Sequence, residues 1–129
     1  MFVKVKRLSG AFEFTLVDTD LSHEKPAPMT VLVMGTVEES QLNTWQAWYE
    51  IAENLVCADL DIDIKRNAVR DLSDWLPPLS RERLLERHRD DLAELARLGS
   101  AVAAAQLEEP VELNEEDPLT IVADWLAHD

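Results

Sequence analysis

Apolar and polar residues alternate over the first 17 residues of the chain in a way that predicts a β-hairpin. Val3 and Val5 alternate with lysines, and after the turn at Ser9-Gly10 the apolar positions from Phe12 to Leu16 alternate with polar ones. Period-2 alternation on either side of a short, glycine-containing turn is typical of two antiparallel strands. One face of this hairpin is apolar, so a further strand or packed helices must cover it.

The segment after the hairpin predicts a loop followed by a third strand. Residues 18–30 hold two prolines and show no clear period, which is typical of a surface loop. The β-branched run from Val31 to Met34 then predicts a strand that ends at Gly35.

A long amphipathic helix is expected over residues 37–57. Thr36 and Glu39 have the spacing of a capping box, and apolar residues then recur at intervals of three and four. The stripe contains the densest aromatic group in the chain, Trp45, Trp48 and Tyr49. These rings either pack in the core against the hairpin or form an exposed hot spot for a partner. If they are core, Trp45→Ala should cost several kcal/mol.

Two more helices follow in the middle of the chain. Apolar spacing predicts a helix over residues 65–76, which Pro77-Pro78 ends. Ser80 is expected to cap a longer helix over residues 81–106. Gly99-Ser100 is the point at which that helix is expected to kink or end early.

The last 23 residues predict an acidic tether and a short helix. Six acids between Leu107 and Asp117 indicate a flexible linker over residues 107–118. Asp117-Pro118 provides an N-cap and a first-turn proline for a helix over residues 119–127. A helix this short is unstable alone, so it must dock either on its own core or on a partner.

These elements together predict an α+β fold: an N-terminal β-hairpin and a third strand packed on three helices, with a short tethered C-terminal helix. A chain of 129 residues suits one core, so we expect a single domain over 1–106, an acidic linker over 107–118 and the C-terminal helix over 119–127. One cysteine, no signal-peptide pattern and no long apolar run predict a cytoplasmic protein.

Charge narrows the class of partner. The chain has 26 acidic and 12 basic residues, a formal net charge of -14, which disfavours direct binding to nucleic acid or to anionic membranes. Residues 18–63 hold ten acids and one basic residue, and residues 100–129 hold eight acids and none. This segregation suits an electropositive partner, and a purely solubilising surface is the alternative interpretation.

No motif in the chain predicts catalysis, a cofactor or a metal site. Asp59, Asp61 and Asp63 resemble the opening of a calcium loop, but Ile64 replaces the glycine at its sixth position and Arg70 the glutamate at its twelfth. The three histidines lack ligand spacing, and three glycines provide no phosphate-binding loop. We therefore expect a non-enzymatic protein.

The spacing of leucines, acids and helix breaks over about 45 residues resembles that of small phage tail assembly chaperones. The stretch comprises Ile51–Val56, the acidic turn Asp59–Asp63, Leu72–Leu76, Arg83–Leu85 and Asp91–Leu95. The resemblance implies an acidic protein with an N-terminal β element that holds a tape-measure protein or tail-tube subunits before assembly. The break at Pro77-Pro78 and the final helix depart from that pattern, and no residue's role is carried over.

The leading hypothesis is an acidic protein-binding module, a phage-type assembly chaperone or adaptor whose partner has a basic or apolar surface. The predicted partner-binding residues are Trp45, Trp48, Tyr49, Asp59, Asp61, Asp63, Leu119, Val122, Trp125 and Leu126. The alternative is an inhibitor that mimics nucleic acid and occupies the DNA- or RNA-binding groove of a host or defence protein. The acids that would imitate phosphates include Asp18, Asp20, Glu38, Glu39, Asp59, Asp61 and Asp63. Neither hypothesis involves a cofactor, direct nucleic-acid binding or a membrane.

Overall fold

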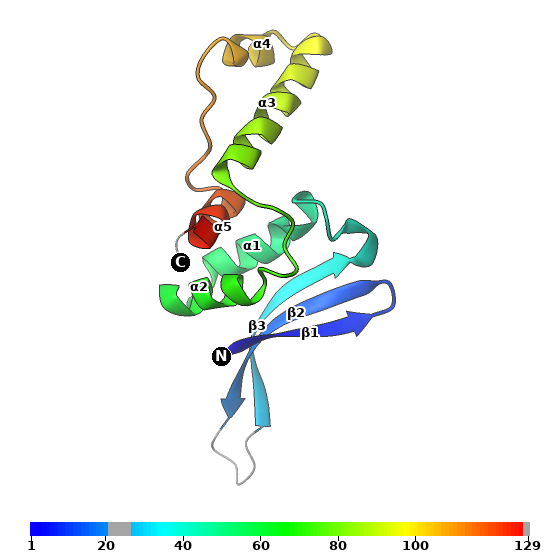
Figure 1. The fold of residues 1–129 in the computed structure, drawn as a ribbon, viewed down its shortest axis with the longest axis vertical. Helices are drawn as coiled ribbons and strands as arrows, with labels where there is room; N and C mark the ends of the chain where they lie inside the picture. Colours follow the sequence, from blue (N-terminus) through cyan, green and yellow to red (C-terminus); the bar gives the residue numbers. More distant parts are fainter. Residues whose placement is uncertain (21–26, 128–129) are drawn as a thin grey trace.

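A three-stranded antiparallel sheet is followed by a series of helices in the computed structural model, which describes residues 1–20 and 27–127 (Figure 1). The α+β class predicted from the sequence is confirmed. The elements are β1 (Phe2–Leu8), β2 (Ala11–Asp20), β3 (Ala27–Glu38), the 3-10 turns η1 (Glu39–Gln41) and η2 (Gln46–Trp48), α1 (Tyr49–Cys57), α2 (Ile62–Asp71), α3 (Arg81–Arg97), α4 (Ala101–Leu107) and α5 (Pro118–Ala127).

The hairpin and a third strand form the sheet in the order β1-β2-β3, with Val5, Phe14 and Gly35 in register across it. Gly10 makes the predicted turn, with φ at 75°, a conformation that costs glycine little. Phe14 and Leu16 are fully buried on the face that carries the helices. The alternation that predicts the hairpin therefore corresponds to one core face and one open face.

The prediction of a loop over residues 18–30 is wrong at both ends. β2 continues to Asp20 and β3 begins at Ala27, with Thr19 paired to Pro28; residues 21–26 lie outside the described residues. Proline is tolerated here because β3 is an edge strand. The predicted end of the third strand at Gly35 is also wrong, because β3 continues to Glu38. Residues 36–38 pair with residues 11–13 of β2, and the local sequence pattern does not show this pairing.

The predicted helix over residues 37–57 is also wrong in its first half. Thr36 lies within β3, so no capping box forms, and residues 39–48 make two short 3-10 turns before α1 begins at Tyr49. The indole Nε1 of Trp48 donates a hydrogen bond to the carbonyl of Leu42 at 2.9 Å. This bond and the burial of Trp48 stabilise the turns of residues 39–48, although the apolar spacing of this segment predicts a continuous helix.

The middle helices differ from prediction mainly at their ends. α2 begins three residues early because Asp61 caps it, accepting a hydrogen bond from the backbone of Asp63, and it ends at Asp71 instead of 76. Ser80 caps α3 as predicted. The chain turns at Gly99, and Ser100 caps α4, so residues 81–106 form two helices.

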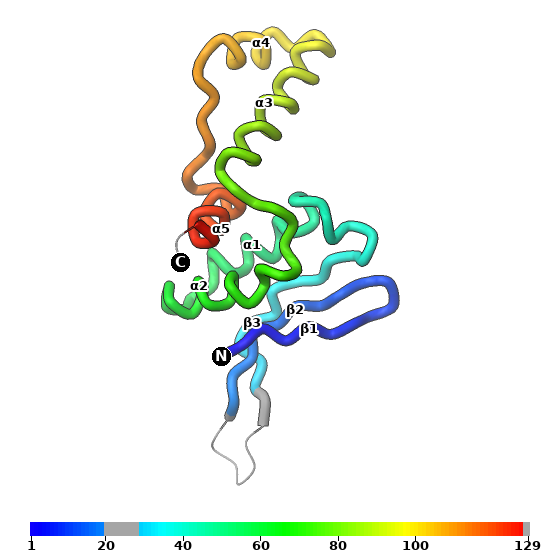
Figure 2. Tube along the Cα trace, viewed as in Figure 1, coloured from blue at the N-terminus to red at the C-terminus, as the bar shows by residue number. Residues whose placement is uncertain are grey.

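The core lies between the sheet and the helices. α1 and α2 cover one face of the sheet, and α5 packs against both helices on the side away from the strands (Figure 2). Val122 of α5 belongs to the same buried cluster as Phe14 and Trp48. Of the two alternatives for the C-terminal helix, the structure therefore shows docking on its own core. We call the sheet with α1, α2 and α5 the body.

A second part projects from the body. α3 extends away from it and α4 folds back at its far end (Figure 1). We call α3 and α4 the arm. The chain returns from the arm through residues 108–117 to reach α5, so the predicted linker is the connection from arm to body. None of the helices within 1–20 and 27–127 combines the length and apolarity needed to cross a membrane.

Candidate partner-binding cleft

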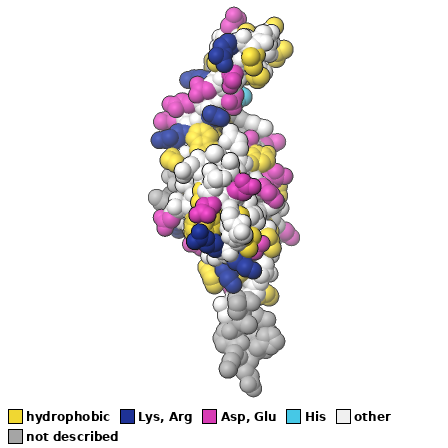
Figure 3. Space-filling view, turned by 90° about the vertical axis from the view of Figure 1, so that its right-hand side faces the viewer, with side chains coloured by type: hydrophobic (Ala, Val, Ile, Leu, Met, Phe, Trp, Pro, Cys, Tyr) yellow, Lys and Arg dark blue, Asp and Glu magenta, His cyan; other side chains and the backbone are white. Residues whose placement is uncertain are grey.

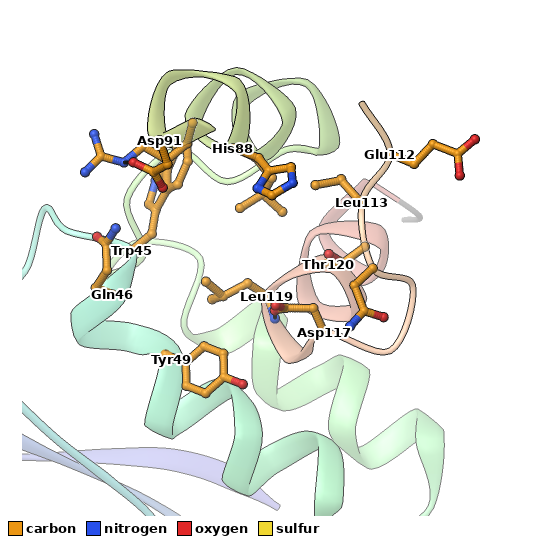
Figure 4. Close-up of a pocket in the computed structure, with 13 residues that line it drawn as sticks. Trp45, Gln46, Tyr49, His88, Asp91, Glu112, Leu113, Asp117, Leu119 and Thr120 are labelled. Atoms are coloured by element: carbon orange, nitrogen blue, oxygen red, sulfur yellow. Dashed lines mark hydrogen bonds and ion pairs between the residues drawn. The ribbon is translucent and has the colours of Figure 1, made fainter. Parts of the chain in front are cut away.

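A cavity of about 520 Å³ lies where the arm leaves the body. Its walls come from three stretches that are far apart in sequence: residues 45–49 around the start of α1, residues 84–91 of α3, and residues 112–120, which run from the returning segment into α5 (Figure 4). We call this cavity the cleft. Its lining residues are Trp45, Gln46, Tyr49, Leu84, Arg87, His88, Asp91, Glu112, Leu113, Asn114, Asp117, Leu119 and Thr120.

Apolar and aromatic side chains form much of the cleft's inner surface. Leu119 lies near its centre, between Tyr49 of α1 and His88 of α3 (Figure 4). Trp45 is half-buried and Tyr49 is 39% exposed, so both rings keep a surface that solvent reaches. Aromatic rings that are held by the fold and still accessible are well suited to anchor a partner.

Acidic groups surround this apolar surface. Asp91 lies 3.8 Å from Arg87 one helical turn away, and the carboxylate of Glu112 points away from the cleft (Figure 4). Asp117 accepts a hydrogen bond from the backbone of Leu119 at 2.9 Å and so caps α5. With Asp91 paired to Arg87, the formal charge of the lining residues stays negative through Asp117 and the outward-directed Glu112. An approaching cation is attracted to this negative rim.

The pKa of Tyr49 is raised by its surroundings. Partial burial raises the pKa of its phenol, and the negative charges of Asp117 and Glu53 raise it further. A phenol is protonated at neutral pH even at its ordinary pKa, and this shift acts in the same direction, so Tyr49 keeps its O–H donor.

Arg81 connects the three segments that meet beside the cleft. Its guanidinium donates to both carboxylate oxygens of Glu115, with one of these bonds at 2.9 Å, and lies 3.3 Å from Asp124 of α5. Arg81 thereby joins the base of the arm, the returning segment and the body. The same hydrogen bonds raise the pKa of Arg81 and lower that of Glu115. We call this group the Arg81 clasp.

The structure divides the predicted partner-binding residues into three sets. Trp45, Tyr49 and Leu119 lie together in the cleft. Trp48 and Val122 are buried in the core, so neither presents the exposed face predicted for it. Trp125 and Leu126 pack half-buried against the core outside the cleft, and each keeps part of its surface accessible. The remaining residues, Asp59, Asp61 and Asp63, lie at the junction of α1 and α2 and do not line the cleft.

Sequence reasoning missed the contribution of the arm and of the returning segment. Leu84 and His88 stand on the apolar side of the predicted helix, and that spacing is a signal of one shared surface. Leu113 lies in a segment whose acidity predicts a flexible tether, yet it is half-buried in the cleft wall. Nothing in its local sequence indicates that contact.

The acids of the predicted phosphate-like row are not neighbours. In the β2–β3 register, Glu38 pairs with Ala11 and Asp18 pairs with Met29. Asp18 is seven residues further along β2 than Ala11, which corresponds to about 23 Å at about 3.3 Å per residue. Asp61 is also engaged in capping α2. The described acids thus form separate groups along the molecule.

Among the described residues, no three His, Cys, Asp or Glu side chains converge in a way that could hold a metal ion. Comparison with protein-family models, with curated proteins and with solved structures finds no match for this chain. The residues of the cleft and of the surface are therefore the basis for a functional hypothesis.

Proposed function

We propose that the protein is a non-enzymatic, acidic protein-binding module, a cytoplasmic assembly chaperone or adaptor that holds a segment of another protein in the cleft. The observation that carries the proposal is the combination of accessible aromatic rings, an apolar interior and a negative rim in one cavity of about 520 Å³. Cavities of this size are typical of sites that bind small ligands or a few side chains of a peptide.

The apolar part of the cleft supplies the anchor. Leu84 is buried and Leu119 half-buried, so the inner wall is built on the core and does not have to be formed upon binding. Trp45 and Tyr49 add rigid rings that a partner's aliphatic side chain can cover. A preformed apolar site reduces the ordering cost of association.

The acidic part supplies selectivity for charge. The rim residues and the net charge of -14 attract basic segments and repel acidic ones. A suitable client is therefore amphipathic, with aliphatic residues on one face and lysine or arginine beside them. Holding such a segment would keep it from premature contacts, as the resemblance to tail assembly chaperones implies.

The test uses two synthetic peptides of about 15 residues, long enough to form an amphipathic helix with leucines at i, i+3, i+4 and i+7. One peptide has lysines at the other positions and its twin has glutamates. We expect the lysine peptide to bind, by calorimetry, and the glutamate peptide to bind at least about tenfold more weakly, a difference near 1.4 kcal/mol.

Cleft variants then locate the site. Tyr49→Ala and Trp45→Ala should each weaken binding of the lysine peptide, whereas Phe2→Ala should leave it unchanged. Phe2 is the matched control because it is also an exposed aromatic residue, at 49% against 39% for Tyr49, but it lies on β1 outside the cleft. If Phe2→Ala and Tyr49→Ala have equal effects, or if the lysine peptide does not bind, the cleft is not the site.

Salt separates this function from mimicry of nucleic acid. An apolar anchor should hold most of its affinity between about 50 and 200 mM salt, whereas a phosphate-like row engaging a basic groove loses orders of magnitude. A collapse of peptide affinity over that range, with no dependence on Tyr49, would favour the mimic.

A further inference from the structure

The end of the arm carries the two most exposed large apolar side chains among the described residues, Leu98 and Val102. Leu98 is 73% exposed, Val102 is 70% exposed and Leu95 is 50% exposed. Figure 3 shows hydrophobic side chains gathered at the top of the molecule, over the end of the arm. We call Leu95, Leu98 and Val102 the arm tip.

The geometry of the arm explains why these side chains face outward. α3 and α4 pack against each other, and each helix buries a side chain: Leu92 is 7% exposed and Ala103 is 3% exposed. Gly99, with φ at 103°, makes the sharp turn between the two helices. The faces of α3 and α4 that turn toward each other hold the buried residues, and the side chains of the arm tip are left exposed to solvent.

Charge identifies the occupant that suits this surface. Arg97 is the only charged residue from 95 to 107, and it lies 3.7 Å from Glu94 of the same helix. The remainder of the chain is strongly acidic, so contact between two bodies would be repulsive. At the arm tip, a second copy would contact apolar side chains and the paired Arg97, so the repulsion between acidic bodies would not oppose this contact.

The length of the arm keeps the acidic bodies apart in such a contact. The 17 residues of α3 span about 26 Å at 1.5 Å per residue. Two arms meeting end to end would separate the bodies by about twice that length, whereas charges are screened beyond about 8 Å at physiological salt. Body-to-body repulsion is therefore small in this arrangement.

We propose that the arm tip is a self-association surface on which Leu95, Leu98 and Val102 of one copy pack against the same residues of a second copy. Such a contact is isologous, as in most homodimers. The arm tip has three apolar side chains, whereas a standard interface has about 20–30 residues on each side. We therefore expect a weak dimer in the micromolar range or above.

Sedimentation equilibrium of the full chain over a wide concentration range tests this directly. The wild type should fit a monomer–dimer equilibrium, and Leu98→Glu and Val102→Glu should each raise the dimer dissociation constant by at least about tenfold. Val33→Glu is the matched control, because Val33 is 56% exposed on the open face of the sheet. Circular dichroism of all three variants checks that they stay folded.

A cross-linking experiment adds a positive signal. In a Cys57→Ser background, Val102→Cys should form a disulfide-linked dimer under mild oxidation, because the proposed contact brings the two copies of Val102 together near its two-fold axis. The wild type carries Cys57 exposed on α1 of the body, so it should cross-link much less.

The outcomes are decisive in both directions. A wild type that remains monomeric at all concentrations, or a Val33→Glu variant that dissociates as much as Leu98→Glu, overturns the proposal. A monomer whose tip binds the lysine peptide in a Leu98-dependent way would make the tip a client site instead. Tyr49→Ala should leave dimerisation unchanged, so failure of the cleft and failure of the tip are distinguishable.

Discussion

Trp48 and Trp45 lie three residues apart, and the structure gives them different roles. The ring of Trp48 is 1% exposed, its centroid lies 5.0 Å from that of Phe14, and its Nε1 is hydrogen-bonded to Leu42. Trp45 is half-buried and lines the cleft. The large stability cost expected from the sequence for Trp45→Ala therefore belongs to Trp48.

Trp48→Ala should lower the free energy of unfolding by about 3–5 kcal/mol, because it removes a buried ring and leaves a cavity. Trp45→Ala should cost at most about 1 kcal/mol, since part of its ring is already in solvent. Urea denaturation followed by far-ultraviolet circular dichroism measures both. Equal losses for the two variants would show that Trp45 also supports the core.

At the scale of elements, docking of α5 depends on a few apolar contacts. Val122→Ala should cost about 1–3 kcal/mol, because Val122 is 3% exposed in the core cluster. Val102→Ala is the same change on an exposed helix face and should stay within about 0.5 kcal/mol. Thermal or urea unfolding of dilute protein compares them. A negligible effect of Val122→Ala would mean that α5 contributes little to the body.

The Arg81 clasp should make stability depend on pH in the acid range. Its hydrogen bonds and charge hold the pKa of Glu115 below its ordinary value of 4.5. A lowered pKa contributes stability above the unfolded value, and this contribution is lost as pH falls through the folded value. Arg81→Gln should thus melt at a lower temperature than the wild type at neutral pH, with the gap narrowing below about pH 4.5.

Arg97→Gln provides the control for that pH series. It removes the same charge from the same helix, but the described contact of Arg97 is with Glu94, within one turn of α3. Melting temperatures at neutral and acid pH should therefore differ little between Arg97→Gln and the wild type. A gap for Arg81→Gln that stays constant as pH falls would show that the clasp acts through packing and not through the charge of Glu115.

For the whole molecule, the division into body and arm separates two kinds of surface. The cleft lies where arm and body meet and combines aromatic rings with carboxylates, whereas the arm tip is apolar and nearly uncharged. A client segment in the cleft and a second copy at the tip would therefore not compete for the same residues. This arrangement lets a dimer carry two acidic cleft-bearing bodies at opposite ends.

The local pattern was sufficient for features that depend on neighbouring residues alone. The hairpin follows from period-2 alternation around Gly10, the start of α3 from the side chain of Ser80, and the break before α4 from Gly99-Ser100. Each of these is a choice between local conformations, made by turn chemistry or a cap. The sequence by itself also determined the acidic balance and the α+β class.

Only the tertiary structure decided where residues 36–48 and α5 go. Helical spacing over 37–57 was overridden because β3 gains ladder partners from β2 and because Trp48 gains both a buried site and a backbone acceptor. The cleft could not be predicted for the same reason: it assembles Tyr49, Leu84 and Leu119 from three separate stretches of the chain. Contacts between distant segments depend on how the chain returns on itself, and no local periodicity records that path.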